Sequence, residues 1–149
     1  MKYYEDTLDH IERVRELLWS FSGRLIQRAR VHDASKLEEP EFSRFANVKT
    51  KLDDVEYGTD EYNELLEELE PALEHHYAHN SHHPEHYEHG VAGMTLADVV
   101  EMLVDWTAAS ERHDDDQDIY DSIEHNAERF DLSDQLTQIL RNTAEELYE

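Results

Sequence analysis

The sequence predicts an all-α protein, folded as a compact bundle of six or seven helices. Only four glycines and three prolines occur in its 149 residues, and the alternation of apolar and polar residues that marks half-buried strands is almost absent. Apolar residues instead recur every three or four positions, a spacing that lines one face of a helix. A chain of this length fits one domain with a sizeable core, so we expect residues 1–149 to form a single helical domain.

The first two expected helices are separated by a glycine. One runs from about Tyr4 to Ser22, and the other follows Gly23 and ends within "VHDASK", residues 31–36. The first helix should turn inward an apolar stripe made of Ile11, Val14, Leu17, Leu18 and Phe21.

Each of the next two expected helices contains a proline. Pro40 opens a third helix at its first turn, where the missing N–H costs nothing. A fourth covers residues 57–80, with Thr59 or Asp60 as its cap. Pro71 lies inside that pattern, so this helix should kink or restart there.

The remaining helices follow a loop over residues 81–94, which Pro84 and two glycines mark. Thr95 caps the most apolar helix, residues 95–110, which we expect at the centre of the bundle. Two amphipathic helices, residues 118–130 and 133–149, complete the fold, and Ser133 caps the last one.

The composition excludes several kinds of protein. Without cysteine there is no disulfide, thiolate metal site or thiol nucleophile. No apolar run is long enough to span a membrane, and no signal peptide is visible, so we expect a cytoplasmic protein. A formal charge of −24 repels long nucleic acids. Such acidity in a folded chain favours a high-salt cytoplasm, that of a halophilic organism or of a host infected by its virus.

Two polar residues fall where the apolar pattern predicts burial. His10 lies on the inward edge of the first helix, where it is either a hydrogen-bonded core histidine or a metal ligand. Asp105 interrupts the central helix, and burying its carboxylate is costly unless it is paired or bound to a metal. Because cations are scarce in this chain, a metal ion is favoured over a buried salt bridge.

At the end of the second expected helix, a histidine is followed directly by an aspartate. His32 and Asp33 are adjacent, so both can reach one ion from a helix end. Lys36 falls on the same face. A lysine beside metal ligands is repelled unless an anion lies between them, and phosphate is the obvious anion.

The order H…HD…D on a helical chain resembles the HD superfamily of metal-dependent phosphohydrolases. "HDASK" is also similar to the "HDIGK" stretch of the HD-GYP phosphodiesterase branch. In that branch a histidine pair between the HD dipeptide and the last aspartate supplies a second metal, and His82 and His83 occupy that interval here. The resemblance implies an HD-like helical fold with a first metal held by His10, His32, Asp33 and Asp105.

A closer likeness covers roughly residues 8 to 110. The pattern "HDASK…PEF…HxxxNxHHPE…EMLVDW" looks like an uncharacterised domain-of-unknown-function family of phage and bacterial proteins. Its H-x-x-x-N-x-H-H portion falls on His76, Asn80, His82 and His83. His76 and Asn80 are one helical turn apart and share a face, and His82 and His83 follow close enough in the loop to point back toward that helix end. On this family pattern we assign the four residues to metal or substrate.

The segment "HHYAHNSHHPEHYEH", residues 75–89, holds four further histidines. A metal-buffering tract, a solvated loop and one defined site are the alternatives for the whole segment. We expect the unassigned four to belong to a polar, partly solvated loop: His75, His79, His86 and His89.

These residues suggest a hydrolase with one or two divalent ions. Imidazole and carboxylate ligands without sulfur suit Mn, Fe, Co, Ni or Zn better than Mg. His76, His82 and His83 would contribute to a second ion, with Asp33 bridging. A bound metal lowers the pKa of its water toward about 7 and provides the nucleophile. Asp33 and Lys36 are therefore the expected catalytic residues, with Lys36 and Asn80 on the substrate.

The expected substrate is a small phosphorylated molecule, with a nucleotide favoured. A non-catalytic, metal-stabilised helical protein that binds a host or phage partner is one alternative, and an HD-type diiron oxygenase is another. The oligomeric state stays open, with a homodimer among the possibilities.

Overall fold

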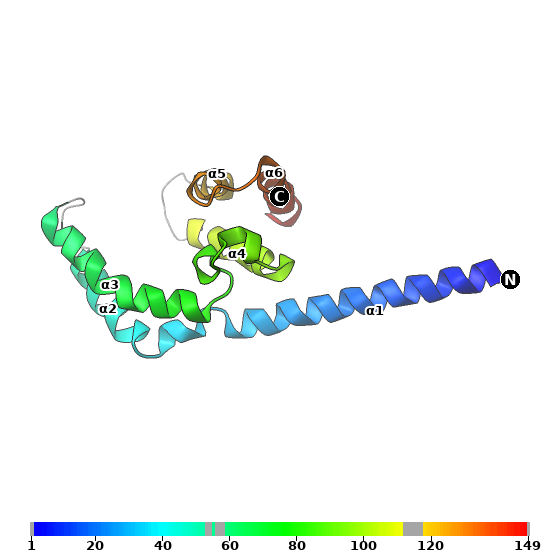
Figure 1. Cartoon of the computed structure of the whole chain (residues 1–149), viewed down its shortest axis with the longest axis horizontal. Coiled ribbons are helices and arrows are strands. Elements are labelled where there is room, and N and C mark those ends of the chain that lie inside the picture. The colour runs from blue at the N-terminus through cyan, green and yellow to red at the C-terminus, as the bar shows by residue number, and fades with distance from the viewer. Residues whose placement is uncertain (1, 53–54, 56–58, 112–117, 149) are drawn as a thin grey trace. The chain divides into compact units, whose positions relative to one another are not determined.

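The computed structural model describes residues 2–52, 55, 59–111 and 118–148. These residues form six α-helices and three short 3₁₀ turns and contain no strand, which confirms the all-α prediction (Figure 1). The α-helices are α1 (Lys2–Val31), α2 (Glu41–Leu52), α3 (Asp60–His79), α4 (Leu96–Ser110), α5 (Ile119–Arg129) and α6 (Asp134–Tyr148). The 3₁₀ turns are η1 (Ala34–Leu37), η2 (Pro84–His86) and η3 (Gly90–Gly93).

The chain divides into two units, residues 1–32 and residues 33–149, and each is described by itself. The first unit is α1, a single helix that runs through Gly23. The predicted helix boundary after Gly23 is therefore wrong. A glycine inside a helix costs only about 1 kcal/mol relative to alanine, and thirty residues with a regular apolar repeat outweigh that cost.

Taken by itself, α1 has no buried residue. Its predicted inward stripe forms a continuous face, but Leu17 is 52% exposed and Leu18 is 61% exposed. A lone helix has no second element to pack against, so the sequence pattern correctly marks an apolar face without identifying what covers it.

The second unit has its main core among α4, α5 and α6. Helix α4 packs on α5, and α5 packs on α6. Met102 and Leu103 of α4 meet Ile123 of α5 and Leu140 of α6, and all four side chains are buried. The predicted role of residues 95–110 as the most apolar helix agrees with this core.

Two predicted caps begin helices of this core. Thr95 forms a capping box with Asp98, in which each side chain bonds the backbone of the other residue. Ser133 Oγ accepts a hydrogen bond from the Leu136 N–H at 3.3 Å, so it caps α6.

Helices α2 and α3 form a second packed pair, in which they lie side by side (Figure 1). Val48 of α2 and Leu65 and Ala72 of α3 are buried. Of the two outcomes predicted at Pro71, a kink or a restart, the restart is wrong, because α3 continues through the proline. Pro71 is exposed, so water can solvate the carbonyl that loses its intrahelical partner.

None of the helices in the described part of the chain is both long and apolar enough to cross a bilayer.

Candidate metal centre

The loop between α3 and α4 is fastened to the start of α4 by one buried carboxylate. Asp98 Oδ1 accepts a hydrogen bond from Ser81 Oγ at 2.6 Å, and Oδ2 accepts one from Tyr87 Oη at 2.9 Å. The backbone N–H and the hydroxyl of Thr95 also donate to Oδ2, at 2.8 and 2.6 Å. Because Ser81 directly precedes His82, these bonds fix where the histidine pair of the loop lies.

Asp33 occupies an uncommon backbone conformation at the N-terminal end of η1. Its φ and ψ are 54° and 17°, in the left-handed region that side chains other than glycine seldom adopt. Aspartate tolerates this region better than most residues. A strained residue persists only where its surroundings hold it, and this one places a carboxylate among three imidazoles.

Four side chains from separate parts of the second unit converge on one point. Asp33, His76, His82 and His83 each offer a ligand atom, and these atoms all lie within 4.8 Å of one another. Asp33 Oδ1 lies 3.4 Å from His76 Nε2 and 3.5 Å from His82 Nε2. The Nε2 atoms of His76 and His83 are 2.9 Å apart.

These separations fit ligands around one ion. Metal–nitrogen and metal–oxygen bonds of about 2.0 to 2.2 Å place neighbouring ligand atoms roughly 2.9 to 3.5 Å apart in tetrahedral or octahedral geometry. The three separations measured here, 2.9, 3.4 and 3.5 Å, fall in that range. Donors of this type suit a first-row divalent ion.

Glu41, the first residue of α2, orients one of the imidazoles. Its carboxylate is 0% exposed, and its oxygens lie 2.7 Å from His75 Nδ1 and 2.9 Å from His76 Nδ1. Burial raises the pKa of Glu41, but the hydrogen bonds from His75, Ser35 and His76 together outweigh it and lower the pKa below its ordinary value. The ionised carboxylate only accepts, so His76 donates through Nδ1 and turns the Nε2 lone pair toward Asp33.

Asn80 supports the same tautomer of His76. Its amide nitrogen donates to Ser35 Oγ and to the His76 carbonyl, both at 2.8 Å. These two bonds use both amide hydrogens, so the His76 Nδ1 proton remains directed at Glu41. The predicted shared face of His76 and Asn80 is confirmed, but in this structure Asn80 contacts the ligand side chains.

A carboxylate of α4 orients a second imidazole. Glu101 Oε1 lies 3.2 Å from His82 Nδ1, on the side opposite the cluster. Asp105, one turn further along α4, places Oδ2 3.9 Å from His82 Nε2. A carboxylate behind a metal-binding histidine raises the basicity of the ligand and fixes the ring, so Glu101 prepares Nε2 of His82 for coordination. Asp105 faces that same nitrogen, on the side where a ligand would lie.

The third imidazole is neutral at physiological pH. Burial, reinforced by the neighbouring His82 and His76 rings and by Lys36, lowers the pKa of His83 to about 3, while Asp33 opposes the shift. A neutral imidazole can bind a metal without first releasing a proton.

Lys36 belongs to the edge of the cluster. Its Nζ donates to Asp33 Oδ2 at 2.6 Å, while Oδ1 of the same carboxylate faces the imidazoles. The lysine is partly exposed, so it can exchange this bond for one to an incoming anion.

Two predicted ligands belong to the first unit. His10 lies on α1 and is exposed, and His32 closes the unit just before Asp33. Because α1 is continuous, the 22 positions from His10 to His32 separate them by about 33 Å, so the prediction that both hold one ion of the same chain is wrong. The participation of His32 stays a prediction, and the centre described above uses residues 33–149 alone.

The four unassigned histidines differ from one another. His86 and His89 are exposed residues of the loop, as expected. His79 is also exposed, but it is the last residue of α3, so its expected place in the loop is wrong. His75 is half-buried on α3 and bonded to Glu41, so the expectation that it lies in a solvated loop is wrong. His79 stacks on His75 at a ring-centroid distance of 4.0 Å.

Glu41, Glu101 and Ser35 were not assigned a role from the sequence. Their signal was nevertheless present, because the motif portions "HDASK", "PEF" and "EMLVDW" contain these three residues. A carboxylate at a helix start looks like an ordinary solvated charge until the fold shows that it is buried.

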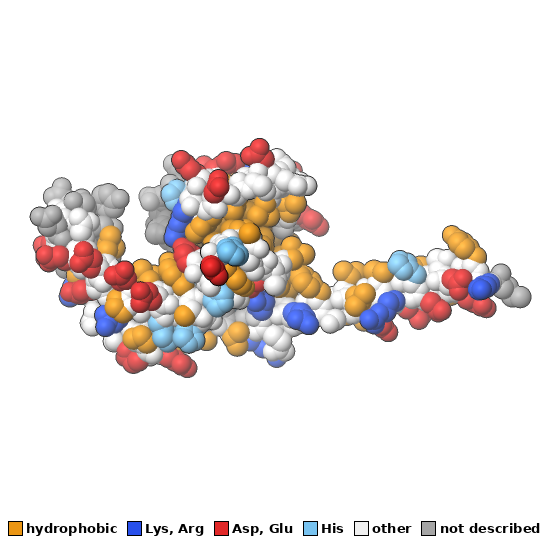
Figure 2. Space-filling model, viewed as in Figure 1, with side chains coloured by type: hydrophobic (Ala, Val, Ile, Leu, Met, Phe, Trp, Pro, Cys, Tyr) orange, Lys and Arg blue, Asp and Glu red, His pale blue; other side chains and the backbone are white. Residues whose placement is uncertain are grey.

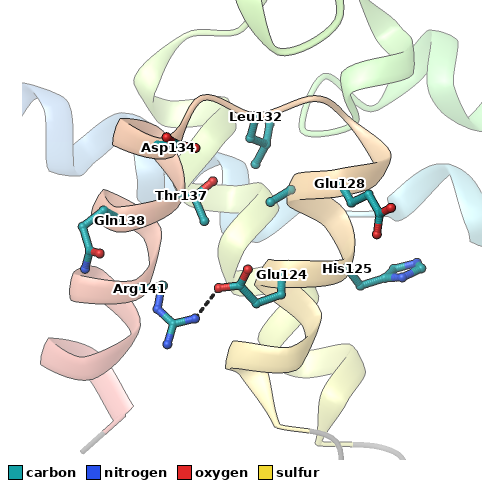
Figure 3. Close-up of a pocket in the computed structure, with 9 residues that line it drawn as sticks. Glu124, His125, Glu128, Leu132, Asp134, Thr137, Gln138 and Arg141 are labelled. Carbon is teal, nitrogen blue, oxygen red and sulfur yellow. Dashed lines mark hydrogen bonds and ion pairs between the residues drawn. The ribbon is translucent and has the colours of Figure 1, made fainter.

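A separate surface pocket of about 610 Å³ lies between α5 and α6 (Figure 3). An ion pair between Arg141 and Glu124 crosses from one helix to the other, and the side chains of His125 and Glu128 point away from it. The pocket contains none of the residues of the cluster, and its acidic side chains do not converge.

Comparison with known protein families assigns the chain to one family. The model of a family of unknown function (DUF5662) matches residues 1–146, and the chain therefore belongs to this family. No curated protein and no solved structure matches the chain.

Proposed function

We propose that this DUF5662 member is a metal-dependent phosphohydrolase acting on a small phosphorylated substrate, with a nucleotide favoured. The observation that supports this proposal is the convergence of Asp33 with three imidazoles, the buried rings of His76 and His82 and the half-buried ring of His83. The Nε2 atoms of His76 and His82 face Asp33 Oδ1. The carboxylates behind His76 and His82 strengthen it, because they leave those nitrogens available as electron-pair donors.

The residues would divide the work between the ion and the substrate. A divalent ion held here supplies an activated water at neutral pH and polarises phosphoryl oxygens. Asp33 would hold the ion through Oδ1 while its Oδ2 positions Lys36. Lys36 would then leave the carboxylate for a phosphoryl oxygen and neutralise the charge that develops there.

The burial of the cluster indicates the side from which a substrate would enter. The side chains of His76 and His82 are 3% and 2% exposed, whereas those of Asp105 and Lys36 are 27% and 44% exposed. Solvent therefore reaches the cluster past the carboxylates and the lysine. An ion with coordination positions on this side would be accessible, as catalysis requires.

The likeness to the HD superfamily supports the reaction class through motifs alone. It adds His32 and Asp105 as further proposed ligands and a second ion bridged by Asp33, whereas His10 lies too far along α1 to share an ion with His32. A histidine nitrogen has a single lone pair, so His82 Nε2 would serve one of the two ions only.

A structural metal site is the second candidate. Asp33 and the three imidazoles already supply four ligands, the number that fills a structural zinc site. The same donors also suit iron, so an oxygenase is a third possibility within the same centre.

The test compares the wild type with Asp33→Ala and with a matched control, His89→Ala, whose side chain is exposed. We expect the purified wild type to contain one or two metal ions per chain. In molar salt and without oxygen, it should release phosphate from at least one nucleotide of a panel. Asp33→Ala should lose at least tenfold in both metal content and phosphate release, whereas His89→Ala should keep both.

The outcomes separate the candidates. Metal and phosphate release that survive in Asp33→Ala would overturn the assignment. Metal without hydrolysis, accompanied by unfolding when the metal is chelated, would favour the structural site. Iron with oxygen-dependent turnover would favour the oxygenase.

A further inference from the structure

Helix α1 presents an apolar face that nothing in its own unit covers. Side chains spaced by three and four residues run along it, a repeat typical of a coiled-coil seam. Figure 2 shows hydrophobic side chains along one side of α1 and charged ones along the other. The exposed fractions of Ile11, Val14 and Leu18 are 42%, 40% and 61%. The seam residues are Ile11, Val14, Leu18, Phe21 and Leu25.

A solitary helix with such a face is incomplete, because most helical stability in proteins comes from packing an apolar face. The charges on α1 indicate what packs against it. Residues 2–16 hold five acids and three bases, a net charge of −2, whereas residues 17–31 hold three arginines and no acid, a net charge of +3.

This separation exceeds what the dipole of the helix favours. The dipole rewards acids in the first turn and bases in the last, and Glu5 and Arg30 satisfy it. Its effect fades within a turn, so it does not account for Glu12, Glu16 or Arg24. In an antiparallel pair of α1 helices, the acidic half of each copy meets the basic half of the other, while a parallel pair sets like charges together.

The rest of the chain also favours the antiparallel arrangement. The first 32 residues hold six of the 13 Lys and Arg and five of the 37 Asp and Glu, which leaves a formal charge of −25 on residues 33–149. That charge begins directly after α1. A 30-residue helix is about 45 Å long, so in an antiparallel pair the two residues 33, where the acidic segments begin, lie tens of ångströms apart. That distance exceeds the screening length of about 10 Å at 0.1 M salt.

We propose that a second copy of this chain covers the apolar face of α1, with the two α1 helices antiparallel. The register that aligns the seams and opposes unlike charges places Leu18 against Phe21 of the second copy and Val14 against its Leu25. This inference does not rest on the cluster of Asp33, His76, His82 and His83, all of which belong to the second unit.

The first test is the mass of the full chain in solution, measured by sedimentation equilibrium in molar salt. The wild type should have about twice the chain mass of 17.6 kDa. Leu18→Asp should weaken dimerisation at least tenfold, and Ser20→Asp, on the opposite side of the helix, should leave it unchanged. Circular dichroism should show that both variants keep their helices. A wild type that stays monomeric at 100 µM, as a helix covered by its own chain would be, overturns the proposal.

The second test fixes the orientation, using the absence of native cysteine. The Val14→Cys and Leu25→Cys proteins are each oxidised alone, and an equimolar mixture of the two is oxidised in the same way. Antiparallel pairing predicts a disulfide-linked dimer only in the mixture. A parallel pair would link each variant to itself, and a dimer with no link in any sample would place the interface elsewhere. Either of these results overturns the proposal.

Discussion

At the scale of single residues, Glu41 shows how a buried charge can prepare a metal site. A fully buried carboxylate is costly unless hydrogen bonds compensate it. Glu41 has that compensation from His75, His76 and Ser35, and its pKa lies below the ordinary value in spite of burial. The charge in turn determines which nitrogen of His76 keeps its proton, so one residue sets the ligand state of another.

We predict that Glu41→Gln weakens metal binding. An amide can turn its N–H toward His76, which would shift the proton of the ring to Nε2 and block coordination. Loss of such a supporting carboxylate lowers metal affinity by about 10- to 100-fold. Isothermal titration with Zn²⁺ and with Mn²⁺ measures the change.

Glu38→Gln is the matched control for this substitution, because Glu38 is exposed and lies three residues away. Its affinity should equal that of the wild type. Unchanged affinity in a folded Glu41→Gln protein would show that Glu41 acts on the packing of α2 alone.

The sequence predicted part of the candidate site. Asp33, His76, His82 and His83 were all identified, because the motifs that carry the family resemblance select them from the seven histidines of residues 75–89 and from the His-Asp pair. Glu41 was missed for a physical reason. The depth of a carboxylate depends on how α2 meets α3, and no local spacing encodes that contact.

At the scale of elements, Asp98 holds the loop between α3 and α4 against the start of α4. This carboxylate caps the helix and also accepts hydrogen bonds from Ser81 and Tyr87 in the loop. Burial raises the pKa of Asp98, but the hydrogen bonds from Ser81, Thr95 and Tyr87 outweigh it and hold the pKa well below its ordinary value of 3.8.

We predict that Asp98→Asn destabilises the metal-free protein by about 2 kcal/mol at pH 7, the usual cost of losing charge-assisted hydrogen bonds. The pKa of the folded state is the lower one, so the ionised carboxylate stabilises the fold above pH of about 5. This contribution is lost as the pH falls through 3.8 toward the folded value. Urea unfolding at pH 7, 5 and 3 should show the gap between wild type and variant shrinking, and a gap independent of pH would contradict the argument.

The helices themselves were largely predictable, and the errors share one cause. Thr95 and Ser133 were identified as caps because their side chains act locally. Gly23 and Pro71 were expected to end or interrupt helices, yet α1 and α3 continue through them. A glycine costs a helix about 1 kcal/mol and a proline about 3 kcal/mol or more, and a long helix or a packed partner such as α2 outweighs that cost.

At the scale of the whole molecule, the charge is concentrated in the second unit. Residues 33–149 carry a formal charge of −25, and residues 1–32 carry +1, which gives the total of −24. Repulsion between like charges therefore acts on the part of the chain that holds the candidate site. Helix α3 illustrates it, because Glu64, Glu67 and Glu70 follow one another at three-residue intervals and all are exposed. Like charges at this spacing destabilise a helix.

We predict that the thermal midpoint of unfolding rises with salt, by several degrees between 0.05 and 2 M KCl, because screening weakens this repulsion. Replacing Glu64, Glu67 and Glu70 together with glutamine should raise the midpoint at 0.05 M by about 3 °C or more and flatten its dependence on KCl. Circular dichroism melts measure both effects, with equal osmolality of sucrose as the control for general solvent effects. If the triple variant keeps the full salt dependence, or if sucrose reproduces it, then the salt acts through hydration of the whole surface and not through the acidic charge that the sequence concentrates after residue 32.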